Sequence, residues 1–124
     1  MGNDIGLLIV DDDELITELL SGYLSAKGYT VKSVNSPGEA FPLIDSVGFD
    51  LVITDLKMEP VGGIAVIKYL HERGFRGKII LMSGFRGDMQ EIANSFRVDY
   101  CIEKPFDLAH MLSKVREFTG ALQR

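Results

Sequence analysis

The 124-residue sequence contains a single cysteine, Cys101. One cysteine cannot form an internal disulfide or a zinc site built from cysteines. Because Cys101 lies in an apolar stretch, we expect it to be a small core residue. No apolar run reaches the ~18 residues that a membrane span needs, and no N-terminal series of basic, apolar and small residues is typical of a signal peptide. We therefore expect a cytoplasmic protein without membrane contact.

Basic residues are fewer than acidic residues. The chain has 13 Lys and Arg against 18 Asp and Glu, a formal net charge of −5. Nucleic acid repels such a chain unless its basic residues are segregated on one face, and the sequence shows no basic cluster. We therefore expect no direct binding to nucleic acid.

Internal repeats, low-complexity segments and linkers are absent, and short apolar runs alternate with helical patterns. The runs predict strands at 5–10, 30–34, 51–54, 78–82 and 100–102. Continuous apolar strands of this kind are typical of a parallel sheet that helices cover on both faces. The length suits one domain. The prediction is an α/β fold over 1–124: a doubly wound, flavodoxin-like sheet of five parallel strands in the order 2-1-3-4-5.

Helix patterns follow the strands. Asp12 or Asp13 can cap the first helix, and Ser36 followed by Pro37 suits the start of the second. Pro42 would cost ~3 kcal/mol inside that helix, so we expect it to start late or to bend there. Two helices show an apolar face, formed by Leu15, Ile16, Leu19, Leu20, Tyr23 and Leu24 in the first helix and by Leu108, Met111, Leu112, Val115 and Leu122 in the last.

Polar residues stand where the predicted strands end. Asp11 and Asp12 follow the first strand, Asp55 the third and Ser83 the fourth, and Lys104 comes just after the fifth. In an open α/β sheet, ligands bind beyond the carboxyl ends of the strands, where the strand order reverses. Neighbouring carboxylates repel one another, and a hard divalent cation such as Mg²⁺ relieves that repulsion. A carboxylate can also attack phosphorus and form an acyl phosphate.

The stretches LLIVDDD, DLVITDLKM, IILMSG and EKPF resemble the four motif regions of the response-regulator receiver family, in the family's order and at its spacing. The resemblance covers essentially the whole chain. It implies that Asp55 is the phospho-acceptor, that Asp12 binds Mg²⁺ directly and that Asp11 does so mainly through water. It also implies that Lys57 offers its backbone carbonyl to the metal.

The same resemblance assigns roles to three further residues. Ser83 matches the hydroxyl residue that hydrogen-bonds the phosphoryl group and moves with it. Lys104 matches the lysine that contacts the phosphoryl group, and the bond to Pro105 is expected to be cis. The family's function is two-component signalling: a histidine kinase or phosphotransfer protein donates the phosphoryl group. The face of helix 4, strand 5 and helix 5 then changes its affinity for a downstream partner, an effector domain or a second copy. Such a domain is not a dedicated enzyme, although it assists its own phosphotransfer and dephosphorylation.

The sequence departs from the family's pattern at several positions. An aromatic residue commonly stands three residues before the lysine, where this chain has Cys101, and Tyr100 would point to the opposite face of the sheet. The sequence leaves open whether Ser83 moves without an aromatic partner or together with Phe85. In addition, Arg97 stands in what is often a glycine-rich turn.

The loop after Asp55 departs as well, with Pro60 one residue later than usual. Lys57 and Phe85 occupy positions that the family uses to tune the phosphoryl lifetime. Together they could restrict attacking water, or Lys57 could pair with a nearby acid.

Two other functions remain as alternatives. One is a binding module of the same fold that does not use phosphorylation. The other is a phosphatase of the haloacid dehalogenase type, because Asp11 and Asp13 have the spacing of that family's paired aspartates. Otherwise Asp13 is expected to be a helix cap or a surface acid. His71 and His110 are expected to lie on the surface, away from the acidic cluster.

Overall fold

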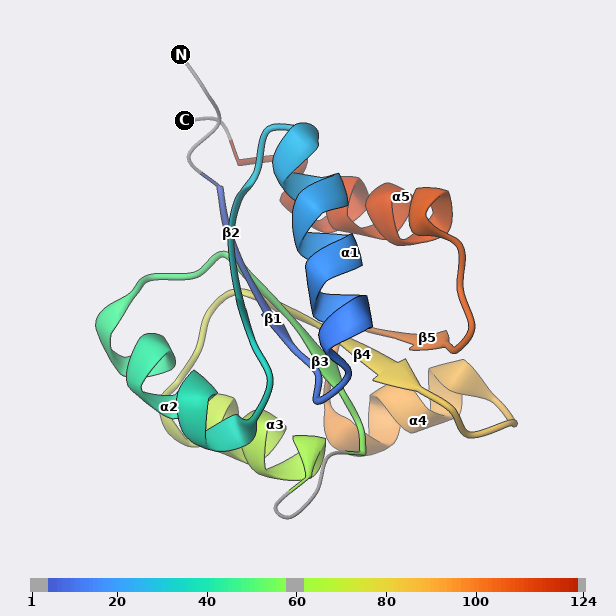
Figure 1. Cartoon of the computed structure of the whole chain (residues 1–124). Helices are drawn as coiled ribbons and strands as arrows, with labels where there is room; N and C mark the ends of the chain where they lie inside the picture. Colours follow the sequence, from blue (N-terminus) through green and yellow to red (C-terminus); the bar gives the residue numbers. More distant parts are fainter. Residues whose placement is uncertain (1–4, 58–61, 123–124) are drawn as a thin grey trace.

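The computed structural model describes residues 5–57 and 62–122, in which five strands alternate with five helices (Figure 1). The elements are β1 (Gly6–Val10), α1 (Glu14–Ala26), β2 (Thr30–Val34), α2 (Pro37–Ser46), β3 (Leu51–Asp55), α3 (Gly63–Glu72), β4 (Lys78–Ser83), α4 (Met89–Phe96), β5 (Tyr100–Glu103) and α5 (Leu108–Thr119). This confirms the predicted alternation, and the predicted strand bounds differ from the observed ones by one residue at most.

The strands form one parallel sheet in the order β2-β1-β3-β4-β5, as predicted. The order reverses between β1 and β3, and both strands are buried by neighbours on either side. Val10 at the end of β1 lies opposite Thr54 near the end of β3. The residues that follow these two strands therefore emerge at the same edge of the sheet.

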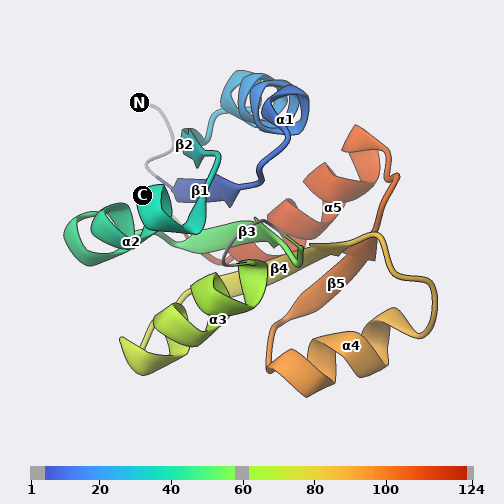
Figure 2. The same cartoon turned by 60° about the horizontal axis from the view of Figure 1, so that its bottom comes forward.

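Helices cover both faces of the sheet (Figure 2). On one face, α1 and α5 pack on the strands, and α2, α3 and α4 cover the other face. Successive strand residues point to opposite faces, so the strands supply two sets of core side chains. Leu7, Ile9, Leu51, Ile53, Ile80 and Met82 face α1 and α5, and Leu8, Val10, Val52, Ile79 and Leu81 face the other three helices.

Side-chain caps set the helix starts. The Asp13 carboxylate accepts a hydrogen bond from the backbone N–H of Leu15, and Ser36 accepts one from Glu39. Since Ser36 caps the helix and Pro37 occupies its first position, α2 begins at Pro37 and runs through Pro42. The expectation that the helix starts late, at Pro42, is therefore wrong. Ser36 and Pro37 fix the start upstream of Pro42, and Pro37 costs no hydrogen bond there, because the first N–H groups of a helix have no partner within it.

The apolar face predicted for α1 is only partly buried. Leu20 and Leu24 are inaccessible to solvent, whereas Leu15 is 77% and Leu19 57% exposed. Each residue turns the helix by about 100°, so Leu15 and Leu19 form a separate row that the sheet does not reach. The apolar face that the sequence pattern predicts for α1 therefore includes two residues that do not pack on the sheet. Leu122, expected on α5, lies beyond the end of that helix at Thr119.

No helix in the described ranges combines the length and apolar character that crossing a membrane requires.

Paired substitutions test the two rows of α1. Leu20→Ala removes a fully buried side chain, and we expect it to lower the free energy of unfolding by about 2–5 kcal/mol. Leu19→Ala, one residue earlier and exposed, should cost less than about 1 kcal/mol. Urea denaturation of both variants measures the difference. Equal losses would mean that Leu19 is buried in solution.

Candidate functional site

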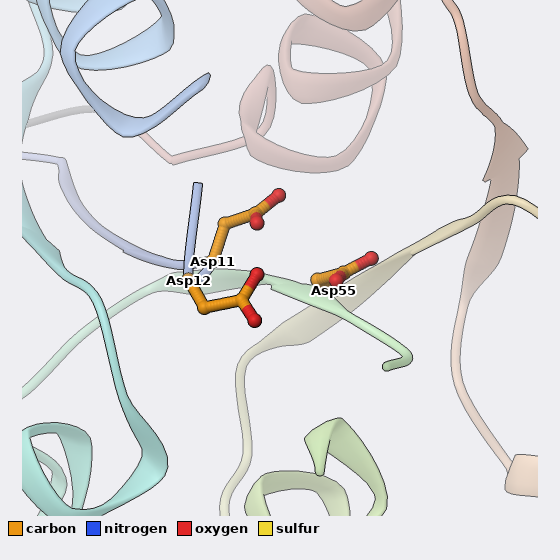
Figure 3. A group of neighbouring side chains, drawn as sticks. All are labelled: Asp11, Asp12 and Asp55. Atoms are coloured by element: carbon orange, nitrogen blue, oxygen red, sulfur yellow. The ribbon is translucent and has the colours of Figure 1, made fainter. Parts of the chain in front are cut away.

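Three aspartates meet at the carboxyl edge of the sheet (Figure 3). Asp11 and Asp12 follow β1, and Asp55 is the last residue of β3. One carboxylate oxygen from each lies within 4.8 Å of the others. Asp11 and Asp55 are buried, whereas Asp12 is exposed. The cluster is therefore buried at Asp11 and Asp55 and accessible to solvent at Asp12.

Several hydrogen bonds fix the orientation of Asp11. Its carboxylate accepts from the backbone N–H of Asp13 at 3.0 Å, and its carbonyl oxygen accepts from the Asn35 side chain at 2.9 Å. Asn35 also donates to the hydroxyl of Thr17. Sequence reasoning missed Asn35 as a positioning residue. The available signal was its place directly after β2, at the same sheet edge as the aspartates.

The Lys104 ammonium group bridges the two buried carboxylates. Its Nζ lies 2.9 Å from Asp11 Oδ2 and 3.1 Å from Asp55 Oδ1. Burial alone would lower the pKa of Lys104, but the hydrogen bond and charge of Asp11, together with Asp55, raise it above the usual value. Lys104 is therefore a permanent cation in the site. The Lys104–Pro105 peptide bond is cis.

Asp55 remains in an unfavourable electrostatic environment despite this ion pair. Burial raises the pKa of Asp55, the charge of Asp11 raises it further, and Lys104 offsets only part of the shift. Three carboxylates thus face one ammonium group. Hard oxygen ligands, one of them exposed, are the donor set that Mg²⁺ prefers. The residues present therefore fit a divalent cation chemically.

Ser83 lies beside Asp55 on the neighbouring strand. Asp55 is opposite Met82 in the sheet, and Ser83 follows as the last, fully buried residue of β4. Its hydroxyl oxygen accepts from the backbone N–H of Phe85 at 3.0 Å, and its carbonyl accepts from Lys104 N–H at 2.7 Å. Ser83 is thus bonded through its side chain to its own loop and through its backbone to the residue that carries the site's cation.

The Lys57 side chain lies against an aromatic ring. Its Nζ is 4.6 Å from the centroid of the Phe85 ring, a distance at which a cation–π interaction contributes about 0.5–1 kcal/mol on an exposed surface. Lys57 and Phe85, the two positions that the sequence analysis considered together, are therefore in contact. Residues 58–61, which include the displaced Pro60, lie outside the described part of the chain.

Gly63 is required by the site itself. A Cβ atom on Gly63 would overlap the backbone carbonyl of Asp55, and its N–H donates to the carbonyl of Leu56. The start of α3 therefore abuts the backbone of the acidic cluster, and only glycine permits that approach.

The side chains of the other sequence candidates make contacts outside the cluster. Asp13 caps α1, His71 contacts the Phe96 carbonyl, and His110 contacts the Tyr100 hydroxyl. Cys101 is buried against α4, with its sulfur 3.6 Å from that of Met89.

Burial raises the Cys101 pKa to about 11, so the thiol stays protonated and unreactive. Tyr100 packs on the opposite face, with the α5 side of the core, as predicted from strand periodicity.

Comparison with known proteins decides the family. The model of the response regulator receiver domain matches residues 7–116. The chain belongs to this family. Receiver domains are signalling domains of two-component systems, and the cluster of Asp11, Asp12 and Asp55 is the kind of acidic site at which such domains bind Mg²⁺ and become phosphorylated.

Named relatives agree with this assignment. The receiver domain is 26% identical over 122 residues to the transcriptional regulatory protein FixJ of Azorhizobium caulinodans, covering 97% of this chain and 57% of that protein. It is 30% identical over 113 residues to the response regulator MprA of Mycolicibacterium vanbaalenii, covering 90% of this chain and 49% of that protein. The chain thus spans about half the length of these curated relatives.

Solved structures show the same fold. The Francisella response regulator 1452 receiver domain superposes with a TM-score of 0.88 at 21% identity, covering 97% of this chain and 100% of that chain. The response regulator TrrA from Thermotoga maritima, solved in complex with Mg²⁺ and BeF, has a TM-score of 0.80 at 27% identity. That match covers 92% of this chain and 98% of that chain.

Asp55→Asn is expected to stabilise the receiver domain at about pH 7 without added metal. Because the folded-state pKa of Asp55 is raised, its protonated form stabilises the fold fully below the unfolded value of about 3.9, and this stabilisation is lost as pH rises through the folded pKa. The neutral amide avoids that loss. Thermal unfolding should show a higher midpoint for the variant at about pH 7 and a smaller difference at about pH 4.

A lower midpoint for the variant at neutral pH would contradict this expectation. It would mean that the ion pair between Asp55 and Lys104 outweighs burial and repulsion by Asp11.

Proposed function

We propose that the receiver domain, residues 1–124 acting as one unit, accepts a phosphoryl group on Asp55 from a histidine kinase or phosphotransfer protein. The observation that carries this proposal is the bridge from Lys104 to both Asp11 and Asp55, beside an exposed third carboxylate. A carboxylate nucleophile, a fixed cation and a place for a second cation are what phosphoryl transfer onto an acid needs.

In this mechanism an Asp55 carboxylate oxygen attacks phosphorus. The new P–O bond forms as the P–N bond of the donor's phosphohistidine breaks, and the donor imidazole leaves with the bonding electrons. Lys104 Nζ, already 3.1 Å from Asp55 Oδ1, would neutralise charge on one phosphoryl oxygen. Ser83 would donate its hydroxyl to another. The phosphoryl group therefore replaces the direct contact between Lys104 and Asp55.

Mg²⁺ would be held by Asp55 and Asp12 directly, by Asp11 mainly through water and by the backbone carbonyl of Lys57. When bound, it would supply positive charge to the phosphoryl oxygens. The exposed position of Asp12 suits a direct ligand, because an ion can reach it from solvent. The similar TrrA structure, which contains Mg²⁺ and BeF, supports the same use of this site.

The signal would pass through Ser83 and its loop. Drawing Ser83 toward a phosphoryl group would pull Phe85, whose N–H bonds to the Ser83 hydroxyl, and would shift α4. The face formed by α4, β5 and α5 would then change its affinity for a downstream protein, an effector domain or a second copy. Because Cys101 stands where the family commonly has an aromatic residue and packs against Met89, Phe85 would move with Ser83 in place of an aromatic residue of β5.

This role is regulatory. The domain would assist its own phosphorylation and dephosphorylation without turning over an independent substrate, and it would act in the cytoplasm.

Incubation with acetyl phosphate and Mg²⁺ tests the acceptor. Intact mass should show one added phosphoryl group on the wild type and none on Asp55→Asn, because the amide cannot form an acyl phosphate. The adduct should be lost in base and should not form without Mg²⁺.

Robust labelling of Asp55→Asn at another residue would refute the assignment of Asp55. The absence of any adduct, even with a cognate kinase, would instead favour a binding module that does not use phosphorylation. Sustained turnover of small phosphate esters would favour the phosphatase alternative.

Substitution of two adjacent aspartates tests the metal assignment. Asp12→Ala should weaken Mg²⁺ binding by about tenfold or more, as loss of a direct charged ligand implies. Asp13→Ala should leave Mg²⁺ binding nearly unchanged and cost about 1 kcal/mol of stability, because Asp13 caps α1. Calorimetric Mg²⁺ titration and urea denaturation measure the two effects. Equal losses of Mg²⁺ affinity would show that the metal assignment is wrong.

A further inference from the structure

Helices α3 and α4 lie on the face of the sheet away from α1 and α5 (Figure 2). Residues of both helices line a groove between them. It consists of two hollows of about 450 and 460 Å³ that share Ile64 and Phe96 in their walls. One hollow begins at Lys57 and Phe85, next to the acidic site, and the other ends at Arg97. The groove therefore extends along most of α3.

The groove has an apolar, partly exposed floor. Ile64 is 52% and Phe85 46% exposed, and Ile92 and Phe96 contribute half-buried side chains. Ile64 is helical and close to other apolar side chains, yet the fold leaves it uncovered. Helix α3 packs toward α2, where Phe41 and Tyr69 stack at 4.4 Å. Helix α4 packs on β5, so the groove between α3 and α4 stays open.

The rim of the groove is basic, although the whole chain carries a net charge of −5. The charged residues that line the two hollows are Lys57, Lys68, Arg86, Arg97 and Glu72. Among the residues that the structure describes, four cations thus stand against one carboxylate. They come from separate segments of the chain, which is why the sequence shows no basic cluster. The fold alone brings them to the two sides of one apolar channel.

We propose that this groove binds an acidic amphipathic helix of a partner protein. A floor of aliphatic and aromatic side chains between basic rims matches a helix with apolar residues at i, i+4 and i+7 and with Asp or Glu on both borders. Helix α3 has 10 residues, so at 1.5 Å per residue the groove is about 15 Å long and accommodates about three helical turns.

The floor favours a protein partner over nucleic acid. Proteins bind single strands by stacking successive bases on a series of aromatic side chains. The exposed part of this floor consists of one aliphatic side chain, Ile64, and one aromatic side chain, Phe85. The proposal concerns the unphosphorylated domain and does not depend on phosphorylation of Asp55.

The test uses the intact, unphosphorylated chain as bait for a displayed library of random 12-residue peptides. Enriched peptides should carry several acidic residues and the i, i+4, i+7 apolar pattern. One such peptide, made synthetically, should perturb backbone NMR signals of α3 and α4. Lys68→Glu should weaken its binding by about fivefold, since reversing one rim charge changes the interaction by about 1 kcal/mol. Lys32→Glu on β2 makes the same change in net charge elsewhere and should leave affinity unchanged.

A second pair of variants tests the apolar floor. Ile64→Ser should weaken peptide binding by about fivefold or more, whereas Leu15→Ser, which removes a more exposed apolar side chain from α1, should not. Circular dichroism verifies that all four variants are folded.

Four results would overturn the proposal. Enriched peptides could lack acidic residues or bind with affinities that Lys68→Glu and Ile64→Ser do not alter. A 12-nucleotide single strand could occupy the groove as tightly as the peptide, which would assign the groove to nucleic acid. Finally, self-association that both Ile64→Ser and Leu15→Ser abolish would assign the groove to α1 of a second copy.

Discussion

The ammonium group of Lys104 lies between the carboxylates of Asp11 and Asp55, and the order of the site depends on this bridge. Without it, two buried carboxylates would face each other at the end of adjacent strands, at a cost of several kcal/mol. Lys104 compensates the negative charge only in part, because the pKa of Asp55 remains raised. The site therefore holds excess negative charge that a metal ion can neutralise, and this incomplete compensation lets the same residues serve both folding and chemistry.

The fold supplies the geometry that such a bridge needs. Asp11 and Asp55 are far apart in sequence but follow neighbouring strands whose carboxyl ends meet. Lys104 reaches them from beyond β5, and its backbone N–H bonds to Ser83 at the end of β4. Close contacts complete the arrangement, since Gly63 lets α3 abut the Asp55 carbonyl. Asp55 and Ser83 are thus the last residues of their strands, and Asp11 and Lys104 directly follow theirs.

Sequence reasoning recovered features that depend on local periodicity and strand ends. It placed the strands, the sheet order, the cluster of aspartates and the opposite orientations of Tyr100 and Cys101. It failed where tertiary contact decides. The apolar pattern of α1 includes Leu15 and Leu19, but contact with the sheet reaches only the adjacent row. The sequence pattern also could not predict the role of Asn35 or the contact between Lys57 and Phe85. Each joins segments of the chain that only folding brings together.

Phe85 connects the acidic site to the groove between α3 and α4. Its backbone N–H bonds to the Ser83 hydroxyl, and its ring lies under Lys57 at the end of the groove. If a ligand at one region prefers one position of this loop, it changes the equilibrium at the other region by the same free energy. The sign of that coupling follows from charge. A phosphoryl group on Asp55 would add negative charge beside the end of the groove at Lys57 and so disfavour an acidic segment bound there.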